Sequence, residues 1–377
     1  MKPASIPDYR EAARRRLPRF LFDYVDGGSY AETTLRRNVD DLAEVALHQR
    51  VLVDVSTINM TTKLFGQPMA MPVMLGPIGL AGMTARRGEV QAARAARSAG
   101  LPFVLSTVSV CPIAEVAAGA GTPPWFQLYM LRDRGFVAEM IAVAKAASCP
   151  VLVFTVDLPT PGARYRDTRS GLAGAPGFGG MVRRGGHVAM RPGWAVEVGL
   201  GGRPLALGNL GGVLGAKTPL SDFLGWLANN FDPSATWADL AWVRAQWPGP
   251  LVVKGVLHPD DARAALGHGA DGIIVSNHGG RQLDGAISAV RALPAIRAAV
   301  GPAAVVLADG GVRSGLDVLR YLTLGADGVL LGRAWAWALA AGGEAGVAHM
   351  LGLLRSELRA AMALTGRVNL APLPPHP

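Results

Sequence analysis

The chain has 377 residues, 50% of them hydrophobic and 17% charged, which allows a large folded core and excludes a chain that is disordered throughout. Its 37 basic and 28 acidic residues give a formal net charge of +9, which favours anionic partners such as nucleic acid, anionic lipid or an acidic substrate. The basic residues are spread along the chain and do not cluster with aromatic residues, so we expect no nucleic-acid partner.

The cysteines and the N-terminus restrict the location of the protein. Cys111 and Cys149 have no CxxC or Cys/His ligand spacing, so the sequence predicts neither a metal site nor a disulfide scaffold. The first residues are charged and do not resemble a signal peptide, and no run of about 18 apolar residues is present. We therefore expect a cytoplasmic protein, or one bound peripherally to the inner face of the cell membrane.

The order of expected elements indicates the fold class. Residues 8–20 and 31–38 are predicted to form short polar helices ahead of the main body. Beyond them, short apolar strands alternate with helical stretches at 87–99, 136–147, 259–267 and 315–324, which is typical of a parallel sheet covered by helices. The predicted strands are 72–75, 103–106, 125–128, 151–156, 251–254, 272–276, 304–308 and 328–331.

Eight such units predict an α/β fold of the (β/α)8 barrel class, since no GxGxxG motif follows an early strand as a doubly wound sheet would favour. We expect a single domain over residues 1–377, with an N-terminal helical extension and a barrel at about 70–345.

Residues 168–235 interrupt the alternation after the fourth strand. The segment has no clear strand and carries many glycines, including Gly171, Gly174, Gly177, Gly179 and Gly180. Loops of this length are functional or disordered. Because Arg183, Arg184 and Arg191 lie near Met181 and Trp194, two interpretations remain: a solvated, mobile loop, or a surface that contacts anionic lipid.

Barrels carry their active sites at the C-terminal ends of the strands, and every predicted strand here ends in polar or glycine residues. The seventh and eighth ends suit a phosphate, because Gly310, Gly311 and Gly332 admit an anion close to the backbone while Arg313 and Arg333 supply charge and paired hydrogen bonds. Ordinary glycine turns with surface arginines are the alternative.

The sixth strand end is the most specific. His278 follows the strand, is flanked by glycines and has Arg281 three residues later. Histidine moves protons near neutral pH, and arginine holds a carboxylate through two parallel bonds. Asp157, which closes the fourth strand, is positioned to stabilise the imidazolium. A catalytic pair is predicted here, and a purely structural His–Asp pair is the alternative.

The run Ser276-Asn277-His278-Gly279-Gly280-Arg281-Gln282-Leu283-Asp284 resembles the signature of the FMN-dependent 2-hydroxy-acid dehydrogenases and oxidases. The resemblance extends from Asp8-Tyr9-Arg10, through Asp26-Gly27-Gly28, to Leu331-Gly332-Arg333-Ala334. The stretches 86–93, 106–112, 161–167 and 226–234 are most similar to the bacterial respiratory, quinone-linked L-lactate dehydrogenases.

The resemblance implies a role for each site residue. His278 would be the base, paired with Asp157; Tyr129 would bind the substrate hydroxyl; and the substrate carboxylate would be held by Tyr24, Arg281 and Arg164. The cofactor would be non-covalent FMN. Its binding residues would be Pro77, Ile78 and Gly79 near flavin N5, Ser106, Gln127 and Thr155 at the flavin edge, Lys254 at the N1/O2 side, Ser276 at the ribityl chain, and Asp309, Gly310, Gly311, Arg313, Gly332 and Arg333 around the ribityl chain and phosphate.

The resemblance also implies the reaction: oxidation of L-lactate or a similar small L-2-hydroxy acid to the 2-keto acid, with electrons passed to a quinone or other respiratory acceptor, by a homotetramer. The alternatives are an oxidase that uses oxygen, a mandelate-type dehydrogenase, another FMN barrel of the inosinate-dehydrogenase type, and a non-catalytic binding barrel. Gly79 stands where glycolate oxidase has alanine and is similar to the dehydrogenase members, which favours a dehydrogenase.

Overall fold

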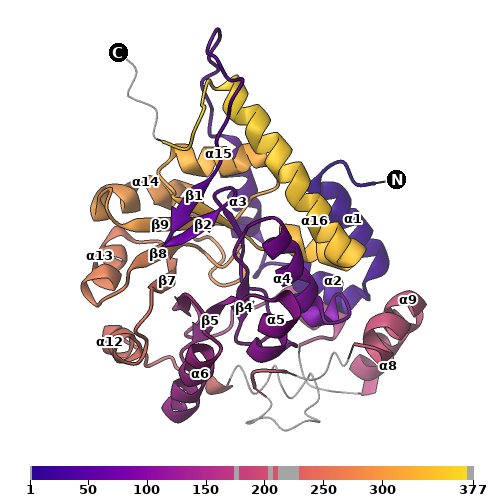
Figure 1. Ribbon diagram of the computed structural model, residues 1–377. Helices are drawn as coiled ribbons and strands as arrows, with labels where there is room; N and C mark the ends of the chain where they lie inside the picture. The colour runs from indigo at the N-terminus through magenta and orange to yellow at the C-terminus, as the bar shows by residue number, and fades with distance from the viewer. Residues whose placement is uncertain (1, 174–177, 203–206, 211–228, 372–377) are drawn as a thin grey trace.

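The computed structural model describes residues 2–173, 178–202, 207–210 and 229–371, and its centre is a barrel of eight parallel strands (Figure 1). Around the barrel the strands follow the order β3-β10-β9-β8-β7-β6-β5-β4, and a parallel bridge from Leu75 to Phe103 closes the gap between β3 and β4. The predicted (β/α)8 barrel is confirmed. The strands are β3 (Val73–Leu75), β4 (Val104–Ser106), β5 (Trp125–Tyr129), β6 (Leu152–Thr155), β7 (Leu251–Val256), β8 (Gly272–Val275), β9 (Val305–Asp309) and β10 (Gly328–Leu331).

A small hairpin closes the N-terminal end of the barrel. It consists of β1 (Thr62–Leu64) and β2 (Gln67–Met69), joined through Phe65 and Gly66, which both have positive φ as a two-residue hairpin turn requires. Leu64 and Met69 pack into the same apolar cluster as the inward-facing strand residues. The indole nitrogen of Trp125, the first residue of β5, donates to Gln67 Oε1 at 3.1 Å. The sequence analysis did not anticipate this hairpin, which leaves only the opposite end of the barrel open for a site.

Helices cover the outside of the barrel, near the predicted positions. A single predicted helix over 87–99 is matched by α4, and the helices predicted at 136–147, 259–267 and 315–324 are matched by α6, α13 and α15. The outer helices are α4 (Gly88–Ser98), α5 (Ile113–Ala120), α6 (Arg134–Ala146), α12 (Trp237–Gln246), α13 (Pro259–Gly267), α14 (Ala289–Val300), α15 (Gly315–Thr323) and α16 (Arg333–Leu364), and a short 3-10 turn, η1 (Ala81–Met83), precedes α4.

The N-terminal extension forms three helices: α1 (Ile6–Arg16), α2 (Arg19–Asp26) and α3 (Thr33–Ala43). The prediction of one helix over 8–20 is wrong, because Pro18 has no N–H to donate and the helix breaks there. α1 packs against α16, α3 packs against α14 and α15, and α2 points its C-terminal end toward the open end of the barrel (Figure 1).

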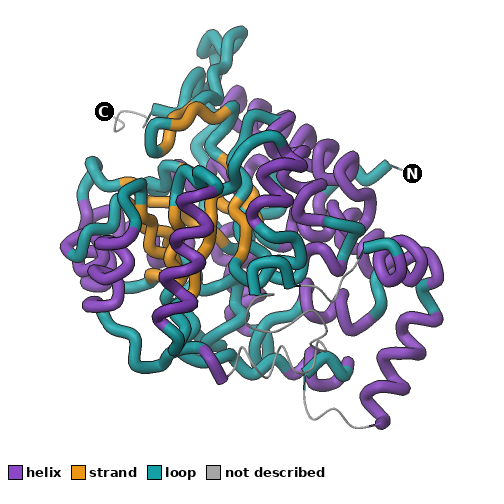
Figure 2. Tube along the Cα trace, turned by 60° about the horizontal axis from the view of Figure 1, so that its bottom comes forward, coloured by secondary structure: helices purple, strands orange, loops and turns teal. Residues whose placement is uncertain are grey.

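The insertion after β6 is more helical than the sequence indicated. Its described part contains the end of α7 (Tyr165–Ser170), α8 (Phe178–Ala189), α9 (Pro192–Trp194) and the π-helix η2 (Ala195–Leu200), which lie to one side of the barrel (Figure 2). Glycine-rich composition concealed these helices, because glycine lowers helix propensity by about 1 kcal/mol per residue. Gly174 and Gly177 lie outside the described residues. No helix within the described ranges is long and apolar enough to cross a membrane.

Candidate active site

A cavity of about 540 Å³ lies at the C-terminal ends of the strands, opposite the hairpin. Residues from the ends of β3, β5, β6, β7, β8, β9 and β10 line it, together with α2 and the segment that follows β6. The structure therefore brings the predicted site residues together. All of them line the cavity except Ser106, Gln127, Asp157 and Ser276. Each of these four is hydrogen-bonded to another predicted site residue.

His278 lies on an unusual turn after β8. His278, Gly279 and Gly280 have φ of 56°, 65° and 72°, so three consecutive residues are left-handed, a conformation that costs a non-glycine residue about 1–2 kcal/mol. The turn directs the imidazole so that Nδ1 lies 2.8 Å from Oδ1 of Asp157, which follows β6, two strands away in the barrel. This pairing leaves Nε2 as the ring nitrogen available to a molecule in the cavity.

Burial and charge determine the protonation of this pair. Burial lowers the pKa of His278, Asp157 opposes that effect, and Lys254 and Arg164 add to it, so the pKa lies below its ordinary value. Burial raises the pKa of Asp157, but His278 and Lys254 outweigh burial and the carboxyl stays below its usual range. At neutral pH a neutral imidazole donates from Nδ1 to an ionised carboxylate, and Nε2 is an acceptor.

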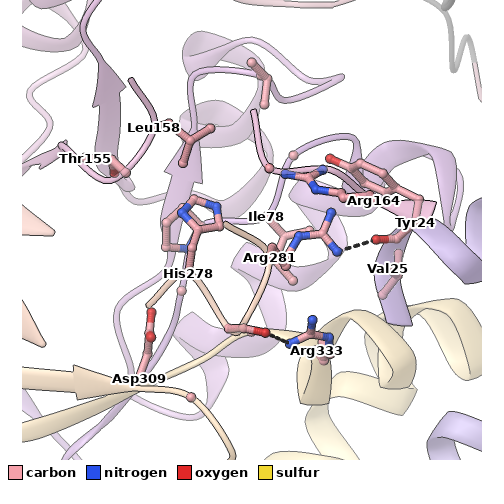
Figure 3. Close-up of a pocket in the computed structure, with 18 of the residues that line it drawn as sticks. Tyr24, Val25, Ile78, Thr155, Leu158, Arg164, His278, Arg281, Asp309 and Arg333 are labelled. Carbon is pink, nitrogen blue, oxygen red and sulfur yellow. Dashed lines mark hydrogen bonds between the residues drawn. The ribbon is translucent and has the colours of Figure 1, made fainter. Parts of the chain in front are cut away.

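Two arginines lie beside this histidine. Nη1 of Arg281 donates to the carbonyls of Tyr24 at 2.6 Å and Gly27 at 2.8 Å, and its guanidinium carbon lies 5.0 Å from the centre of the Tyr24 ring. Nε of Arg164 has no hydrogen-bond partner among the described residues. Figure 3 shows Arg164, Arg281 and Tyr24 grouped on one side of His278. This arrangement leaves donors of both guanidinium groups for an anion.

The pKa of Arg281 supports the same conclusion. Burial and the nearby charge of Arg164 lower the pKa of Arg281 to about 10, although Tyr24 and Asp167 oppose the shift. Arg281 still carries its charge at neutral pH. Because a buried cation is costly without a partner, a carboxylate placed between these arginines would be strongly favoured.

Lys254 projects from β7 into the barrel and is 3% exposed. Its ammonium donates to Ser276 Oγ at 2.8 Å and lies 3.0 Å from Oδ2 of Asp309. Burial lowers the pKa of Lys254, but Asp309 and Asp157 more than compensate and raise it above the ordinary value. Side chains of the protein therefore satisfy the Lys254 ammonium.

Several buried polar atoms nearby are unsatisfied. Nε2 of Gln127, Oγ1 of Thr155 and Oδ1 of Asp309 have no hydrogen-bond partner among the described residues. The carbonyl oxygen of the Gln127 side chain accepts from Ser106 Oγ at 3.1 Å, which fixes the amide and leaves its nitrogen free. Buried polar groups are rarely left without partners, so these atoms indicate a ligand that hydrogen-bonds along the ends of β5, β6 and β9.

The strand ends predicted to bind phosphate are glycine-rich and positively charged. Gly310 and Gly311 have φ of 103° and 77°, and Gly332 begins α16. Arg313 lies over the ring of Trp337 at 4.7 Å. Burial lowers the pKa of Arg313 to about 10, and the pKa of Arg333 lies well below its usual value because of burial and the nearby charges of Arg281 and Arg313. Two arginines partly withdrawn from water at one place favour binding of an anion there.

Arg333 differs from the expectation in one respect. Its Nε, Nη1 and Nη2 donate to the carbonyls of Asp26 at 3.1 Å, Gly279 at 2.9 Å and Gly27 at 2.8 Å. Three of its five N–H donors are thus directed at main chain, so the paired hydrogen bonds that the sequence predicted for it can come only from the remaining N–H groups of Nη1 and Nη2. Arg333 joins α2 to the turn that carries His278 (Figure 3).

Other residues at the site were not anticipated. Asp26 accepts from Arg10 Nε at 2.5 Å and from Arg166 Nη1 at 2.7 Å, which ties α1 and α7 to α2. An apolar wall also lines the cavity. It consists of Val108, Leu158, Leu172, Ala173 and Phe231. These residues come from separate loops, so no local pattern could have identified them.

Comparison with known proteins identifies the family. A family model described as FMN-dependent dehydrogenase matches residues 13–376. The chain belongs to this family. Relatives named L-lactate dehydrogenase are 61% identical: one from Caulobacter vibrioides over 98% of this chain and 95% of its own length, and one from Chromohalobacter salexigens over 97% and 93%. A solved monotopic membrane protein, (S)-mandelate dehydrogenase, has a TM-score of 0.91 at 35% identity, covering 100% of this chain and 98% of its own; a mandelate oxidase has 0.83 at 39%, covering 98% and 96%.

The cofactor of this FMN-dependent dehydrogenase is FMN, and the cavity fits it. The unpartnered atoms of Gln127, Thr155 and Asp309 offer a donor, a hydroxyl and an acceptor to a polar ring and a polyol chain. The glycines and buried arginines after β9 and β10 suit a phosphate.

The Gly310–Gly311 loop provides a test of this fit. A Cβ at Gly311 would overlap the carbonyl oxygen of Asn38, and its φ of 77° is already unfavourable for alanine. We expect Gly311→Ala to displace the loop and to weaken FMN retention by at least about tenfold, measured by flavin fluorescence during dialysis, in keeping with a backbone strain of about 1–2 kcal/mol plus the overlap.

Gly285→Ala is the matched control, because its φ is 86° but a Cβ would meet no described atom within 4 Å. It should retain FMN as wild type does. Equal retention by both variants would contradict the assignment of the Gly310–Gly311 loop to the cofactor.

Proposed function

We propose that this protein oxidises L-lactate, or a similar small L-2-hydroxy acid, to the 2-keto acid. The observation that carries the proposal is the juxtaposition in one cavity of the His278–Asp157 pair with Arg281 and Arg164. A base and an anion site on neighbouring walls match a substrate with a hydroxyl and a carboxylate on adjacent carbons. The two relatives at 61% identity carry the name L-lactate dehydrogenase, which supports the substrate.

His278 is proposed as the base. Oxidation of a 2-hydroxy acid removes two protons and two electrons from its carbon–oxygen unit, and bound FMN supplies the acceptor for the electrons. Nε2 of His278 takes a proton from the substrate whether the α-hydrogen leaves as a proton or as a hydride. The imidazolium that forms lies 2.8 Å from the ionised Asp157, which stabilises it by a few kcal/mol, about 1–3 for a charge-assisted pair.

The substrate is proposed to be oriented by four further residues. Arg281, Arg164 and Tyr24 hold its carboxylate. Tyr129, on β5, donates to its hydroxyl: burial and the nearby Asp157 raise the pKa of Tyr129, so the phenol remains protonated. The apolar wall that includes Leu172, Ala173 and Phe231 contacts the substrate side chain.

The remaining predicted residues are proposed to hold FMN. Gln127, Thr155 and Ser106 bind the edge of the flavin, Lys254 supplies positive charge beside it, and Ser276 fixes Lys254. Backbone at Pro77, Ile78 and Gly79 lines the same cavity. The ribityl chain and phosphate are bound by Asp309, Gly310, Gly311, Arg313, Gly332 and Arg333.

The acceptor proposed is a quinone or another respiratory carrier. Gly79, which matches the dehydrogenase members, supports an acceptor other than oxygen. A mandelate-type reaction is a second candidate, because the solved (S)-mandelate dehydrogenase has a TM-score of 0.91 over the whole chain.

Anaerobic stopped-flow reduction of the flavin tests the substrate directly. Wild-type protein should be reduced rapidly by L-lactate and poorly by D-lactate and L-mandelate. Faster reduction by L-mandelate would select the second candidate. Hydrogen peroxide production at the full rate of turnover in air would select an oxidase, and no reduction by any L-2-hydroxy acid would overturn the proposal.

In the same assay His278→Gln should keep its FMN and lose roughly 10³-fold in the rate of flavin reduction, as expected for removal of a general base.

We also propose that the protein binds an anionic membrane surface through α8, α9 and η2. Trp194, which we had associated with this contact, is buried against Phe20 and donates to Met83 O at 2.7 Å, so it is not the anchor. The exposed apolar residues of the segment are Met181, Val182, Met190, Val196 and Leu200. Arg183, Arg184 and Arg191 lie among them, and the solved (S)-mandelate dehydrogenase is described as monotopic. Exposed apolar residues among basic ones are typical of interfacial helices.

Vesicle co-sedimentation tests this contact. The protein should bind phosphatidylglycerol vesicles and dissociate from them in high salt, and it should not bind phosphatidylcholine vesicles. Met181→Glu with Val182→Glu should abolish binding. Val143→Glu with Leu316→Glu, which adds the same charge at exposed positions on α6 and α15, should not. Equal binding by the two double variants would show that α8 is not the contact.

A homotetramer is the assembly proposed. Val51 and Leu52 are 74% and 104% exposed on a loop that projects at the top of Figure 1. The loop is anchored where Arg50 N donates to Leu364 O at 3.0 Å and Asn59 N donates to Val368 O at 2.8 Å. Ordered, exposed apolar residues of this kind are typical of a protein interface.

Multi-angle light scattering measures the assembly. Wild type should have the mass of four chains at micromolar concentration, and Leu52→Asp should be smaller, because a buried charge disfavours the interface. Tyr30, exposed elsewhere, supplies the control Tyr30→Asp, which should leave the mass unchanged. A monomeric wild type would contradict the proposal.

A further inference from the structure

Two buried amides connect the N-terminal extension to the turn that carries His278. Asn38 on α3 is 2% exposed and Asn277, which precedes His278, is 5% exposed. Asn38 Nδ2 donates to Asn277 Oδ1 at 2.9 Å, and Asn277 Nδ2 donates back to Asn38 Oδ1 at 2.7 Å. The two residues are 239 positions apart in the chain, so the pair is a purely tertiary contact.

The Asn277 amide closes the left-handed turn. Its Oδ1 also accepts from the Gly280 N–H at 3.1 Å, and its Nδ2 also donates to the carbonyl of Ile287 at 3.1 Å. Gly280 N–H and the Ile287 carbonyl fix which way round the Asn277 amide lies, and the Asn38 amide, paired with it in that orientation, holds it in place. If the amide turned over, Gly280 N–H would face an NH2 group and Ile287 O would face a carbonyl oxygen, so two bonds would be lost.

The strain in the turn explains why such a support is needed. His278 is a non-glycine residue at φ 56°. It follows Asn277 and precedes two glycines, which have no side chain to restrict backbone rotation. Without the bond to Gly280 N–H, the turn has fewer contacts that oppose relaxation of His278 to a right-handed conformation. Relaxation would move the imidazole away from Asp157, 2.8 Å from its Nδ1.

The main chain of Asn38 makes a second contact, with the loop after β9. Its carbonyl oxygen is so close to Gly311 that a Cβ there would overlap it. The same residue thus supports the turn after β8 through its side chain and the loop after β9 through its backbone. A substitution of the side chain leaves the second contact in place.

We infer that the side chain of Asn38 is a positioning residue for His278: it anchors the Asn277 amide, which holds the left-handed turn and keeps the imidazole on Asp157. Asn38 does not line the cavity, so it acts through the turn and not on the substrate. The inference rests on the proposed function for its kinetic consequences, but its effect on the imidazole does not require turnover.

Asn38→Asp and Asn38→Ala test the inference. Asp is isosteric, keeps the acceptor for Asn277 Nδ2 and loses the donor to Asn277 Oδ1; Ala removes both. Asp40→Ala, at an exposed position of the same helix, is the matched control. We expect both Asn38 variants to lose about tenfold to 100-fold in kcat per bound flavin, as misplacement of a reacting group does, with a much smaller change in KM because Arg281 is anchored on α2.

The pH profile separates positioning from loss of stability. Asp157 raises the pKa of His278, whereas burial, Lys254 and Arg164 lower it, so an imidazole that leaves Asp157 has a lower pKa. Since the base must be unprotonated, the acid limb of kcat/KM should move to lower pH in the Asn38 variants and stay in place in Asp40→Ala. The pH dependence of His278 carbethoxylation by diethyl pyrocarbonate, followed by peptide mass spectrometry, should move in the same direction in protein that is not turning over.

The outcomes are distinguishable. FMN affinity, measured by fluorescence titration of the apoprotein, should stay within about threefold of wild type, less than the factor that 1 kcal/mol represents. An unchanged acid limb and unchanged kcat per flavin would overturn the inference. Loss of FMN or of folding in both Asn38 variants, without a shift of the His278 profile, would show a merely structural role and also overturn it. A shifted carbethoxylation profile in a protein that oxidises no 2-hydroxy acid would refute the proposed function and leave the inference standing.

Discussion

Buried positive charge around one cavity is the constraint on which the site depends. Lys254 is buried and Arg281, Arg313 and Arg333 are partly buried at the open end of the barrel, and burial acts to lower the pKa of each. Among the residues that the structure describes, only Lys254 of these four is matched closely by a side-chain carboxylate, that of Asp309. A binding site for an anionic cofactor and an anionic substrate needs this imbalance, because a site already neutralised by its own carboxylates would offer a second anion little.

Main-chain carbonyls at the end of α2 stabilise part of this positive charge before a ligand binds. The C-terminal end of a helix has carbonyls without helical partners and a partial negative charge, and here Tyr24, Asp26 and Gly27 offer theirs to Arg281 and Arg333. The Asp26 side chain, held by Arg10 and Arg166, fixes α2 in turn. The helix lies outside the barrel, yet its carbonyls hold both Arg281 and Arg333 at the cavity. This explains why an N-terminal extension accompanies the barrel.

The sequence supported much of the fold and of the candidate site because both depend on local patterns. Apolar strands alternating with helices indicated eight β/α units, and the strand ends named residues that now line one cavity, among them His278, Lys254 and Thr155. Three elements had no local pattern that revealed them. The glycines of α8 concealed a helix, Pro18 divided a helix that polarity alone suggested was continuous, and the hairpin of β1 and β2 was too short to be recognised.

What the sequence by itself determined is the identity of the chemical groups and the strand that carries each one. Strand periodicity places them at a common rim, and the run from Ser276 to Asp284 contains the histidine and the arginine that we propose as base and anion site. What only the tertiary structure decided is their orientation: the left-handed turn at His278, the Asn38–Asn277 amide pair, the direction of Arg333 toward main-chain carbonyls, and the burial of Trp194. The physical reason is that these features arise from hydrogen bonds between residues far apart in the chain, and a local pattern contains no information on which distant partner satisfies a buried polar group.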